Sequence, residues 1–160
     1  GFRYVIIGNS SAGRAAAHAI RMIDDDAQIT VISEEPSPFY CRPLLPDLIG
    51  GLTEEDFFAA NPYAEDDRLR LTLGETVAAV DTSERTVQCA SGLHVPYDAL
   101  LLAVGSAPIR IPWPGSEAEG VAGVRSPASA LRRGGGTVGA GCGLVSGGPG
   151  GAWGFRGARG

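Results

Sequence analysis

Lysine is absent from the 160-residue sequence, in which all thirteen basic residues are arginine. Cysteine is also scarce. Cys41, Cys89 and Cys142 are odd in number and far apart, which excludes a disulfide framework or a zinc motif and favours reduced thiols in a cytoplasm. No apolar run approaches the length of a membrane span, and nothing resembles a signal peptide. Because the length suits one domain, we expect a cytoplasmic globular protein with no membrane partner and no metal site.

Negative charge is unevenly spread along the chain. Residues 132–160 contain four arginines and no acidic residue, whereas residues 1–131 hold nine arginines and all eighteen acidic residues. An acidic body does not attract nucleic acid, and a short basic tail is usually only solvated. The charge pattern therefore predicts no nucleic-acid partner.

The first 33 residues predict a strand, a helix and a second strand. Residues 3–7 form a β-branched apolar run that ends at Gly8, and residues 12–23 are rich in helix formers with one apolar side. Residues 28–33 are again β-rich. Such a βαβ unit implies parallel strands. The predicted fold class is therefore α/β, with a Rossmann-like parallel sheet.

Shorter elements are predicted over residues 35–105. Four prolines mark residues 35–52 as a loop, and a capping pattern at Thr53 starts a short helix that runs through Ala60. Residues 99–105 predict a buried strand that ends at a glycine. A small β-meander is expected from four β-rich runs, at residues 69–73, 76–81, 86–90 and 93–97.

Residues 132–160 differ in composition from the rest of the chain. Thirteen of them are glycine, and each glycine in a helix or strand costs roughly 0.5–1 kcal/mol relative to alanine. We therefore expect a disordered Gly/Arg-rich tail that follows a first domain of residues 1–131.

The turn after the first strand matches a phosphate-binding loop with one change. In the G-x-G-x-x-G pattern the first glycine makes the turn, the second admits the pyrophosphate, and the third lets helix and strand pack closely. Gly8 and Gly13 supply the first and third, Ala12 keeps the packing small, and Ser10 replaces the second as a donor to phosphate. Ser10 or Ser11 can cap the helix, whose exposed N–H groups bind an anion. The alternative is a turn that serves only packing.

Three charged residues follow the second predicted strand. A carboxylate at this strand end can accept hydrogen bonds from ribose hydroxyls and disfavours a 2′-phosphate. Glu34 is the first candidate and Glu35 the second, and the alternative for either is a solvated carboxylate. Arg42 lies in a proline-stiffened loop and is suited to bind a pyrophosphate bidentately. Its alternative is a surface arginine without a role.

Three stretches together resemble the N-terminal FAD-binding region of the pyridine-nucleotide-dependent flavoprotein oxidoreductases. They are YVIIGNSSAG at residues 4–13, ITVISEEPSPFYCRPLLPDLIGG at residues 29–51 and YDALLLAVGSAPI at residues 97–109. The most similar branch contains rubredoxin and ferredoxin reductases and the flavin domain of NADH-nitrite reductases, in which a Gly-Asn-Ser-x-Ala-Gly version of the loop, with serine at the position of Ser10, is a familiar variant. The resemblance covers residues 3–131.

The resemblance implies which positions bind FAD. Glu34 matches the ribose-binding acid, Arg42 a basic residue beside the flavin phosphates, and Val77 the residue whose backbone faces the adenine. Residues 103–106 match an Ala-Thr-Gly motif that closes over the FAD, with valine in place of threonine. No catalytic residue is predicted. The predicted cofactor-binding residues are Gly8, Ser10, Ser11, Ala12, Gly13, Glu34, Glu35, Arg42, Val77, Ala103, Val104, Gly105 and Ser106.

The resemblance also sets an expectation for the end of the chain. A unit that binds NADH or NADPH should begin near residue 135 with a strand, a glycine motif and a helix. The sequence GTVGAGCGLVSGGPG at residues 136–150 lacks the flanking strand and helix, so we expect only a remnant of that unit. The prediction is a truncated chain with an incomplete three-layer FAD domain, inactive by itself, with a frameshift near Arg132 as the hypothesis.

Three functions stay open at this point. The first is the FAD-binding portion of an NAD(P)H-dependent oxidoreductase that passes electrons to rubredoxin, ferredoxin or a small acceptor. The second is a nucleotide-binding module that requires a separately encoded partner. The third is a folded remnant that binds nothing. The oligomeric state is not predicted.

Overall fold

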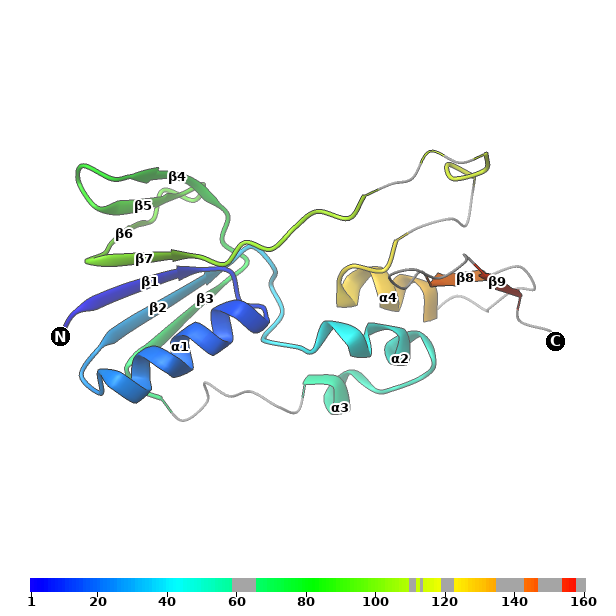
Figure 1. The fold of residues 1–160 in the computed structure, drawn as a ribbon, viewed down its shortest axis with the longest axis horizontal. Coiled ribbons are helices and arrows are strands. Elements are labelled where there is room, and N and C mark those ends of the chain that lie inside the picture. Colours follow the sequence, from blue (N-terminus) through cyan, green and yellow to red (C-terminus); the bar gives the residue numbers. More distant parts are fainter. Residues whose placement is uncertain are drawn as a thin grey trace. The chain divides into compact units, whose positions relative to one another are not determined.

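The computed structural model describes residues 1–58, 66–109, 112, 114–118, 123–134, 143–146 and 154–157. The chain divides into two compact units, and each is described by itself. Unit 1 comprises Gly1–Cys41 and Glu54–Ala107, and unit 2 comprises Arg42–Thr53 and Pro108–Gly160. Figure 1 labels the helices and strands of both units.

A parallel four-stranded sheet forms the centre of unit 1 (Figure 1). All three strand pairings are parallel, and β1 lies between β2 and β7. Helix α1 (Ser11–Ile23) connects β1 to β2, which confirms the predicted βαβ unit and the α/β fold class. The strands are, in spatial order, β3 (Leu69–Leu73), β2 (Gln28–Ser33), β1 (Arg3–Ile7) and β7 (Ala99–Leu102).

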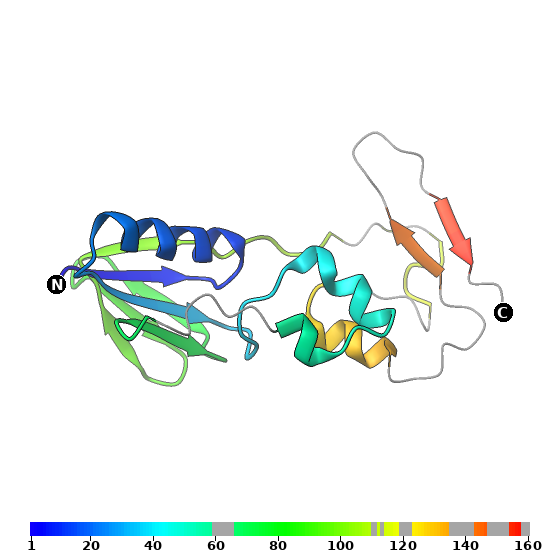
Figure 2. The same cartoon turned by 90° about the horizontal axis from the view of Figure 1, so that it is seen from below.

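Helix α1 covers one face of this sheet (Figure 2). Its sequence is rich in alanine, which favours a helix and leaves a flat apolar side. Gly13 and Ala17 are buried on that side, and Ala17 belongs to one core cluster with Ile6, Ile29 and Val31 of the sheet. These three sheet residues are at most 1% exposed, so burial of apolar surface holds the helix on the sheet.

A three-stranded antiparallel sheet covers the opposite face (Figures 1 and 2). Val87 and Tyr97 pack there against Val5, Ile7 and Ile32 of the parallel sheet. Unit 1 therefore has three layers, with the parallel sheet in the middle, and the meander is confirmed for its last three strands. These are, in spatial order, β4 (Val77–Asp81), β5 (Thr86–Cys89) and β6 (His94–Pro96).

Two strand predictions were wrong in detail. Residues 69–73 were expected in the meander, but as β3 they pair in parallel with β2, because Leu69 and Leu71 pack with the core beneath α1. Residues 99–105 were expected to form a buried strand, but β7 ends at Leu102. Leu101 and Leu102 are 42% and 63% exposed, since β7 lies at the edge of the sheet and is covered less than β1.

The predicted loop over residues 35–52 contains a helix, which is a further correction. A short 3₁₀ helix, η1 (Arg42–Leu44), leads into α2 (Leu45–Ile49), whose first turn holds Pro46. Proline is tolerated there because the N–H groups of the first turn have no partner within the helix. The predicted short helix after Thr53 is α3 (Glu54–Phe58), and its expected end at Ala60 lies outside the described residues. Within the described ranges, no helix is both long enough and apolar enough to cross a membrane.

Unit 2 contains elements that the sequence patterns did not predict. Helix α4 (Pro127–Gly134) contacts α2, and β8 (Gly143–Ser146) pairs antiparallel with β9 (Gly154–Gly157). Helix α4 spans the predicted boundary between residues 131 and 132. Much of the predicted disordered tail lies outside the described residues, so its disorder stays a prediction.

Two ion pairs tie distant segments of unit 1 together. Arg3 donates from Nε and Nη2 to the two carboxylate oxygens of Asp98, at 3.0 and 2.7 Å, which joins the starts of β1 and β7. Arg21 donates to both carboxylate oxygens of Asp66 and, through Nη1, to the backbone oxygen of Ala27 at 2.8 Å. The first bidentate pair holds the start of β1 beside the start of β7, and the second holds the end of α1 beside the segment before β3.

Candidate active site at the carboxyl edge of the parallel sheet

The predicted site residues of unit 1 come together at one edge of the parallel sheet. Ile7 of β1 is in register with Ile32 of β2 and with Leu102 of β7, so all three strands end at the same level. The segments that follow these strand ends start at Gly8, Glu34 and Ala103. We call this the carboxyl edge, and in open parallel sheets it is where ligands bind.

Two glycines make the turn from β1 into α1 tight. Gly8 has a φ of +113°, and a Cβ atom at this position would overlap the backbone oxygen of Ala103. A Cβ atom at Gly13 would overlap the backbone oxygen of Gly8. The Gly8 N–H also donates to the oxygen of Ile32 at 2.8 Å. The geometry therefore requires a glycine at position 8 for the turn and a glycine at position 13 for the close packing of helix and strand, as predicted.

The start of α1 points its free backbone N–H groups out of the first turn. Ser10 is the N-cap residue, its side chain makes no capping hydrogen bond, and its carbonyl accepts from the N–H of Arg14 at 2.9 Å. Ser11 and Ala12 are exposed. The N–H groups of a first helical turn have no partner within the helix and bind anions. The arrangement suits a phosphate group.

The two candidate acids after β2 differ in their surroundings. Glu34 is exposed, whereas Glu35 is half-buried and accepts a hydrogen bond from the hydroxyl of Tyr40 at 2.6 Å. Arg14 lies 4.4 Å from the ring centroid of Phe39, which connects the first turn of α1 to the segment after β2. Glu34 is therefore the more accessible of the two acids, and the choice between them as the ribose-binding acid stays a prediction.

The other predicted residues of unit 1 border the same edge. Ala103 is 9% exposed and its N–H donates to the oxygen of Ile7 at 2.8 Å, while Val104 is 67% exposed. Gly105 and Ser106 are exposed. Val77 is half-buried and begins β4, directly after the turn that follows β3. These positions can cover a ligand that lies across the edge.

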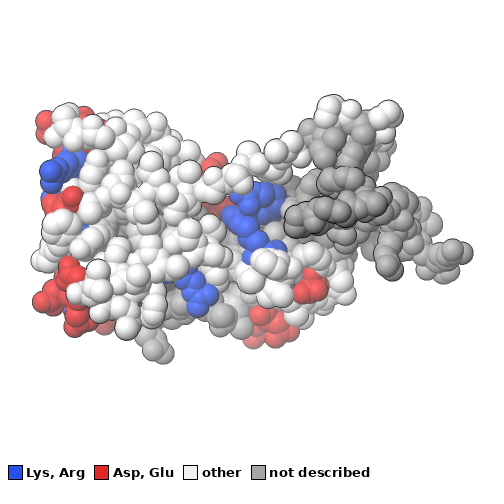
Figure 3. Space-filling view, viewed as in Figure 1, with Lys and Arg blue, Asp and Glu red and all other residues white. Residues whose placement is uncertain are grey.

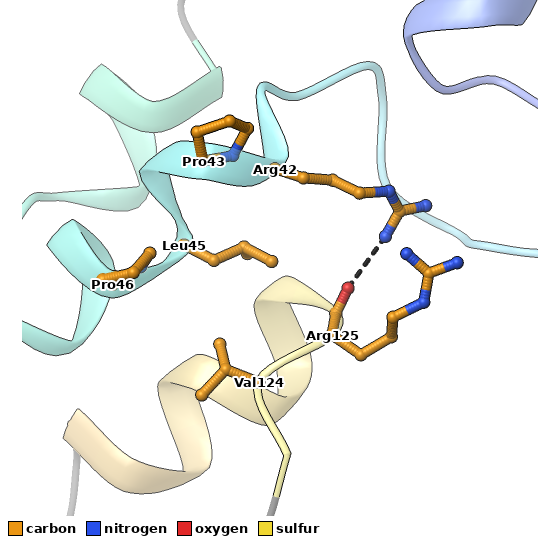
Figure 4. A pocket seen from close by; sticks show the side chains of 6 residues that line it. All are labelled: Arg42, Pro43, Leu45, Pro46, Val124 and Arg125. Atoms are coloured by element: carbon orange, nitrogen blue, oxygen red, sulfur yellow. Dashed lines mark hydrogen bonds between the residues drawn. The ribbon is translucent and has the colours of Figure 1, made fainter. Parts of the chain in front are cut away.

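Arg42 belongs to unit 2, where it begins η1. Its Nη1 donates to the backbone oxygen of Arg125 at 2.8 Å, and both arginines line a pocket of about 320 Å³ (Figure 4). Because Arg42 and the carboxyl edge are in different units, the role of Arg42 at a pyrophosphate stays a prediction. The remaining lining residues are Pro43, Leu45, Pro46 and Val124.

Sequence analysis missed Asn9, the residue between Gly8 and Ser10. In the described part of the chain, its Oδ1 and Nδ2 are the only buried side-chain polar atoms that have no hydrogen-bond partner. A buried amide without partners is costly, so it needs a physical explanation. The G-x-G-x-x-G pattern gives a role only to its glycines, so the pattern assigned none to Asn9.

Acidic side chains gather at the opposite end of unit 1. Asp24, Asp25 and Asp26 follow α1, and Asp66 and Asp67 precede β3, which places them near the amino ends of β2 and β3. Figure 3 shows acidic side chains at the end of unit 1 that holds the N-terminus. This cluster lies at the amino end of the sheet, whereas the carboxyl edge carries Glu34 and Glu35.

The two described cysteines are free. Cys41 is exposed, and Cys89 is buried in the core, where burial raises the pKa of its thiol. A raised pKa keeps Cys89 protonated and unreactive.

The carboxyl edge fits the pyrophosphate of a dinucleotide. The turn leaves no room for a side chain at Gly8 or Gly13, and the first turn of α1 offers free N–H groups. Each feature favours an anionic group with hydrogen-bonding oxygens.

Comparisons with known proteins agree with this geometry. The family model of the pyridine nucleotide-disulphide oxidoreductases matches residues 2–142. Nitrite reductase [NAD(P)H] of Bacillus subtilis (strain 168) is 37% identical over 124 residues, which are 76% of this chain and 15% of that protein. The NADH:rubredoxin oxidoreductase of Clostridium acetobutylicum superposes with a TM-score of 0.69 and 27% identity, over 81% of this chain and 34% of its own.

A third comparison includes a partner protein. The covalent complex of putidaredoxin reductase with putidaredoxin matches with a TM-score of 0.62 and 26% identity, over 70% of this chain and 28% of that chain. The chain thus spans between about a seventh and a third of the proteins that it matches here. The matched family and its reductases depend on FAD and NAD(P)H. This chain belongs to the pyridine nucleotide-disulphide oxidoreductase family, in its FAD-binding domain.

Proposed function

We propose that the chain binds FAD at the carboxyl edge as part of an NAD(P)H-dependent flavoprotein oxidoreductase. The observation that carries the proposal is the turn at Gly8 and Gly13, which brings the backbone and the start of α1 to a ligand without an intervening side chain. When bound, FAD supplies the exchange between two-electron donors such as NAD(P)H and one-electron acceptors.

The residues have distinct roles in this proposal. The N–H groups at Ser11 and Ala12 bind the pyrophosphate, with the Ser10 hydroxyl as a further donor. Glu34 accepts from the ribose hydroxyls, with Glu35 as the alternative. Residues 103–106 and the backbone of Val77 border the bound cofactor. Arg42 contributes a guanidinium to the phosphates.

We further propose that the electrons pass to a small redox protein. Two of the similar structures support this, because one is named for rubredoxin and the other is a complex with putidaredoxin. The acceptor of this chain would then be a small protein of the rubredoxin or ferredoxin kind, and the alternative to this proposal is a small-molecule acceptor.

The chain by itself is proposed to bind FAD but not to react with NADH. Residues 136–150, where the sequence suggests a remnant of a second glycine motif, contain β8, and β8 pairs antiparallel with β9. A dinucleotide-binding unit requires a strand followed by a helix and a parallel strand. The antiparallel ribbon therefore favours a chain that needs a further polypeptide for hydride transfer.

A titration tests two of these proposals, FAD binding and the lack of reaction with NADH. The purified chain is titrated with FAD, and binding is followed by calorimetry and by the flavin absorption band at ~450 nm. We expect a dissociation constant on the order of micromolar. NADH is then added without and with cell lysate. We expect no bleaching without lysate. Failure to bind FAD at high micromolar protein would overturn the proposed function, whereas bleaching by NADH alone would overturn only the incompetence of the chain.

A further inference from the structure

Helix α1 presents an apolar side to solvent. Gly13 and Ala17 are buried against the sheet, and in Figure 2 the helix lies at the surface of unit 1. Residues spaced by three and four positions share one side of a helix. On the side that faces away from the sheet, five exposed residues follow this spacing, and we call them the outer face of α1: Ala12, Ala15, Ala19, Met22 and Ile23.

The outer face has no charged side chain. A surface helix normally carries charged residues on its solvent side, but the two arginines of α1 are held by their own unit. Arg14 lies 4.4 Å from the ring centroid of Phe39, and Arg21 donates to Asp66 at 2.8 Å. An apolar side that is left in water in this way is typical of a contact surface.

The sizes of its side chains indicate what the outer face contacts. The large residues Met22 and Ile23, 73% and 84% exposed, stand at one end, and Ala12 stands at the other. A second copy of α1 that runs antiparallel has the reverse order. It would set Met22 of each copy against Ala12 of the other, with Ala15 against Ala19 in the middle, where small side chains let two helices approach closely. A parallel pair would instead set Met22 against Met22 and leave a gap between the alanines.

The charges at the two ends of α1 favour the same arrangement. Asp24, Asp25 and Asp26 follow the helix, and Arg68, which pairs with Asp25 and Asp26 at 2.9 and 3.5 Å, balances only one of the three charges. The first turn of α1 has no acidic residue, and the N–H groups of a first turn carry partial positive charge. An antiparallel pair brings the acidic end of each helix beside the start of the other, whereas a parallel pair would bring the two acidic ends together.

We propose that the chain forms a homodimer in which the outer faces of α1 from two copies pack antiparallel about a two-fold axis. Each copy then contributes the same surface, as a two-fold interface requires. The proposal does not depend on FAD binding. A single helix pair buries less surface than the roughly 1,200 Å² of a stable interface, so we expect a dissociation constant of about 10–100 micromolar.

Sedimentation equilibrium of the whole chain without FAD, from about 5 to about 300 micromolar, tests the dimer. We expect the parent to change from monomer to dimer over this range and Ala19→Arg to dimerise at least about tenfold more weakly. Arginine is a good helix former, so α1 should stay intact, which circular dichroism checks. Ala79→Arg is the matched control. It places the same side chain at an exposed alanine of β4, in the antiparallel sheet on the other side of the parallel sheet, and should dimerise like the parent.

A mixture of two variants tests the orientation of the helices. Ala15→Glu and Ala19→Arg should each weaken the dimer when studied alone. In an antiparallel pair, position 15 of one copy lies opposite position 19 of the other. The introduced carboxylate and guanidinium therefore meet in the mixture, and we expect the mixture to dimerise more tightly than either variant.

Three results would overturn the inference. The first is a parent that stays monomeric at the highest concentration. The second is an Ala19→Arg variant that dimerises like the parent, because the interface would then lie elsewhere, for example at the free edge of β7. The third is a mixture no tighter than its components, which contradicts the antiparallel pairing. If Ala19→Arg does not fold, Met22→Ser takes its place, and a Met22→Ser dimer as tight as that of the parent has the same meaning as the second result. FAD titration of the parent is a separate measurement, so a failure of the proposed function leaves these outcomes unchanged.

Discussion

Gly13 controls how closely α1 approaches the turn after β1. A methyl group at this position would meet the backbone oxygen of Gly8, and backbone cannot rotate away as a side chain can. The site therefore depends on the absence of a side chain, and this makes the turn sensitive to the smallest substitution.

Gly13→Ala tests this dependence. Alanine favours a helix by about 1 kcal/mol over glycine, but overpacking typically costs about 1–3 kcal/mol, so we expect a lower free energy of unfolding and loss of FAD binding. Urea unfolding and FAD titration measure the two effects. Gly123→Ala is the matched control, because a Cβ atom there meets nothing within 4 Å. Equal behaviour of the two variants would show that the turn can relax.

Arg42 is the predicted site residue that lies in unit 2. We expect Arg42→Ala to weaken FAD by roughly 2–4 kcal/mol, since charge-assisted hydrogen bonds to phosphate are strong. The lost bond to the Arg125 oxygen should lower the free energy of unfolding by only about 1 kcal/mol. FAD titration and urea unfolding of the apo protein report these separately.

Arg42→Lys refines the same test. Lysine keeps the charge but loses the planar fork, so a loss close to that of alanine indicates bidentate binding, and full retention indicates a point charge. Arg70→Ala, at an exposed position on β3, is the control and should bind FAD like the parent. If neither variant at position 42 changes FAD binding, Arg42 does not belong to the site.

At the scale of elements, the Arg3–Asp98 pair joins the beginnings of β1 and β7. The hydrogen bonds from Arg3 lower the pKa of Asp98 from 3.8 to about 2. A carboxyl group whose pKa is lower in the folded state stabilises that state above its unfolded pKa, and this stabilisation is lost as the pH falls through the folded value. The stabilisation that the Asp98 carboxylate contributes is therefore lost as the pH falls from about 4 to about 2.

Asp98→Asn tests the pair through its pH dependence. We expect the parent to unfold at a higher temperature than the variant above pH 4 and the difference to narrow as the pH falls toward 2. Thermal unfolding of both proteins across this range measures it. A difference that stays constant over the range would mean that the charge of Asp98 is not what stabilises the strand pair.

Sequence patterns predicted elements well where hydrophobic periodicity determines them. The β-branched runs of β1 and β2 and the alanine-rich α1 have the bounds expected within one residue, because burial on the sheet requires those side chains. Helix α2 was missed because its prolines suggest a loop, although Pro46 in the first turn is compatible with a helix.

Within the candidate site, the backbone parts were predictable and the side-chain contacts were not. Gly8 and Gly13 follow a spacing that the geometry of the turn requires. The isolation of the Asn9 amide and the bond from Tyr40 to Glu35 depend on which groups tertiary packing brings near, and spacing along the chain does not encode that.

For the whole molecule, the division into two units predicts which parts FAD binding requires. Ser106 is the last residue of the predicted site, whereas Ala130 is buried in α4 of unit 2. We expect a chain shortened to residues 1–134, which keeps α4 whole, to bind FAD with an affinity within about twofold of that of the parent. The removed residues contain no predicted site residue, and changes at sites without shared partners act independently. Calorimetry on both chains checks this. A loss of affinity beyond tenfold would place part of the site in residues 135–160.

The position of β7 in the parallel sheet determines the order in which the domain can be completed during translation. Arg3 and Asp98 are 95 positions apart, so the ribosome has released β1, β2 and β3 long before β7 is available. Until then β1 is an edge strand, with Val5, Ile6 and Ile7 beside unpaired backbone groups. Such an edge pairs readily with other chains. Nascent chains that stall before Ala99 are therefore the forms of this protein that should aggregate or bind chaperones.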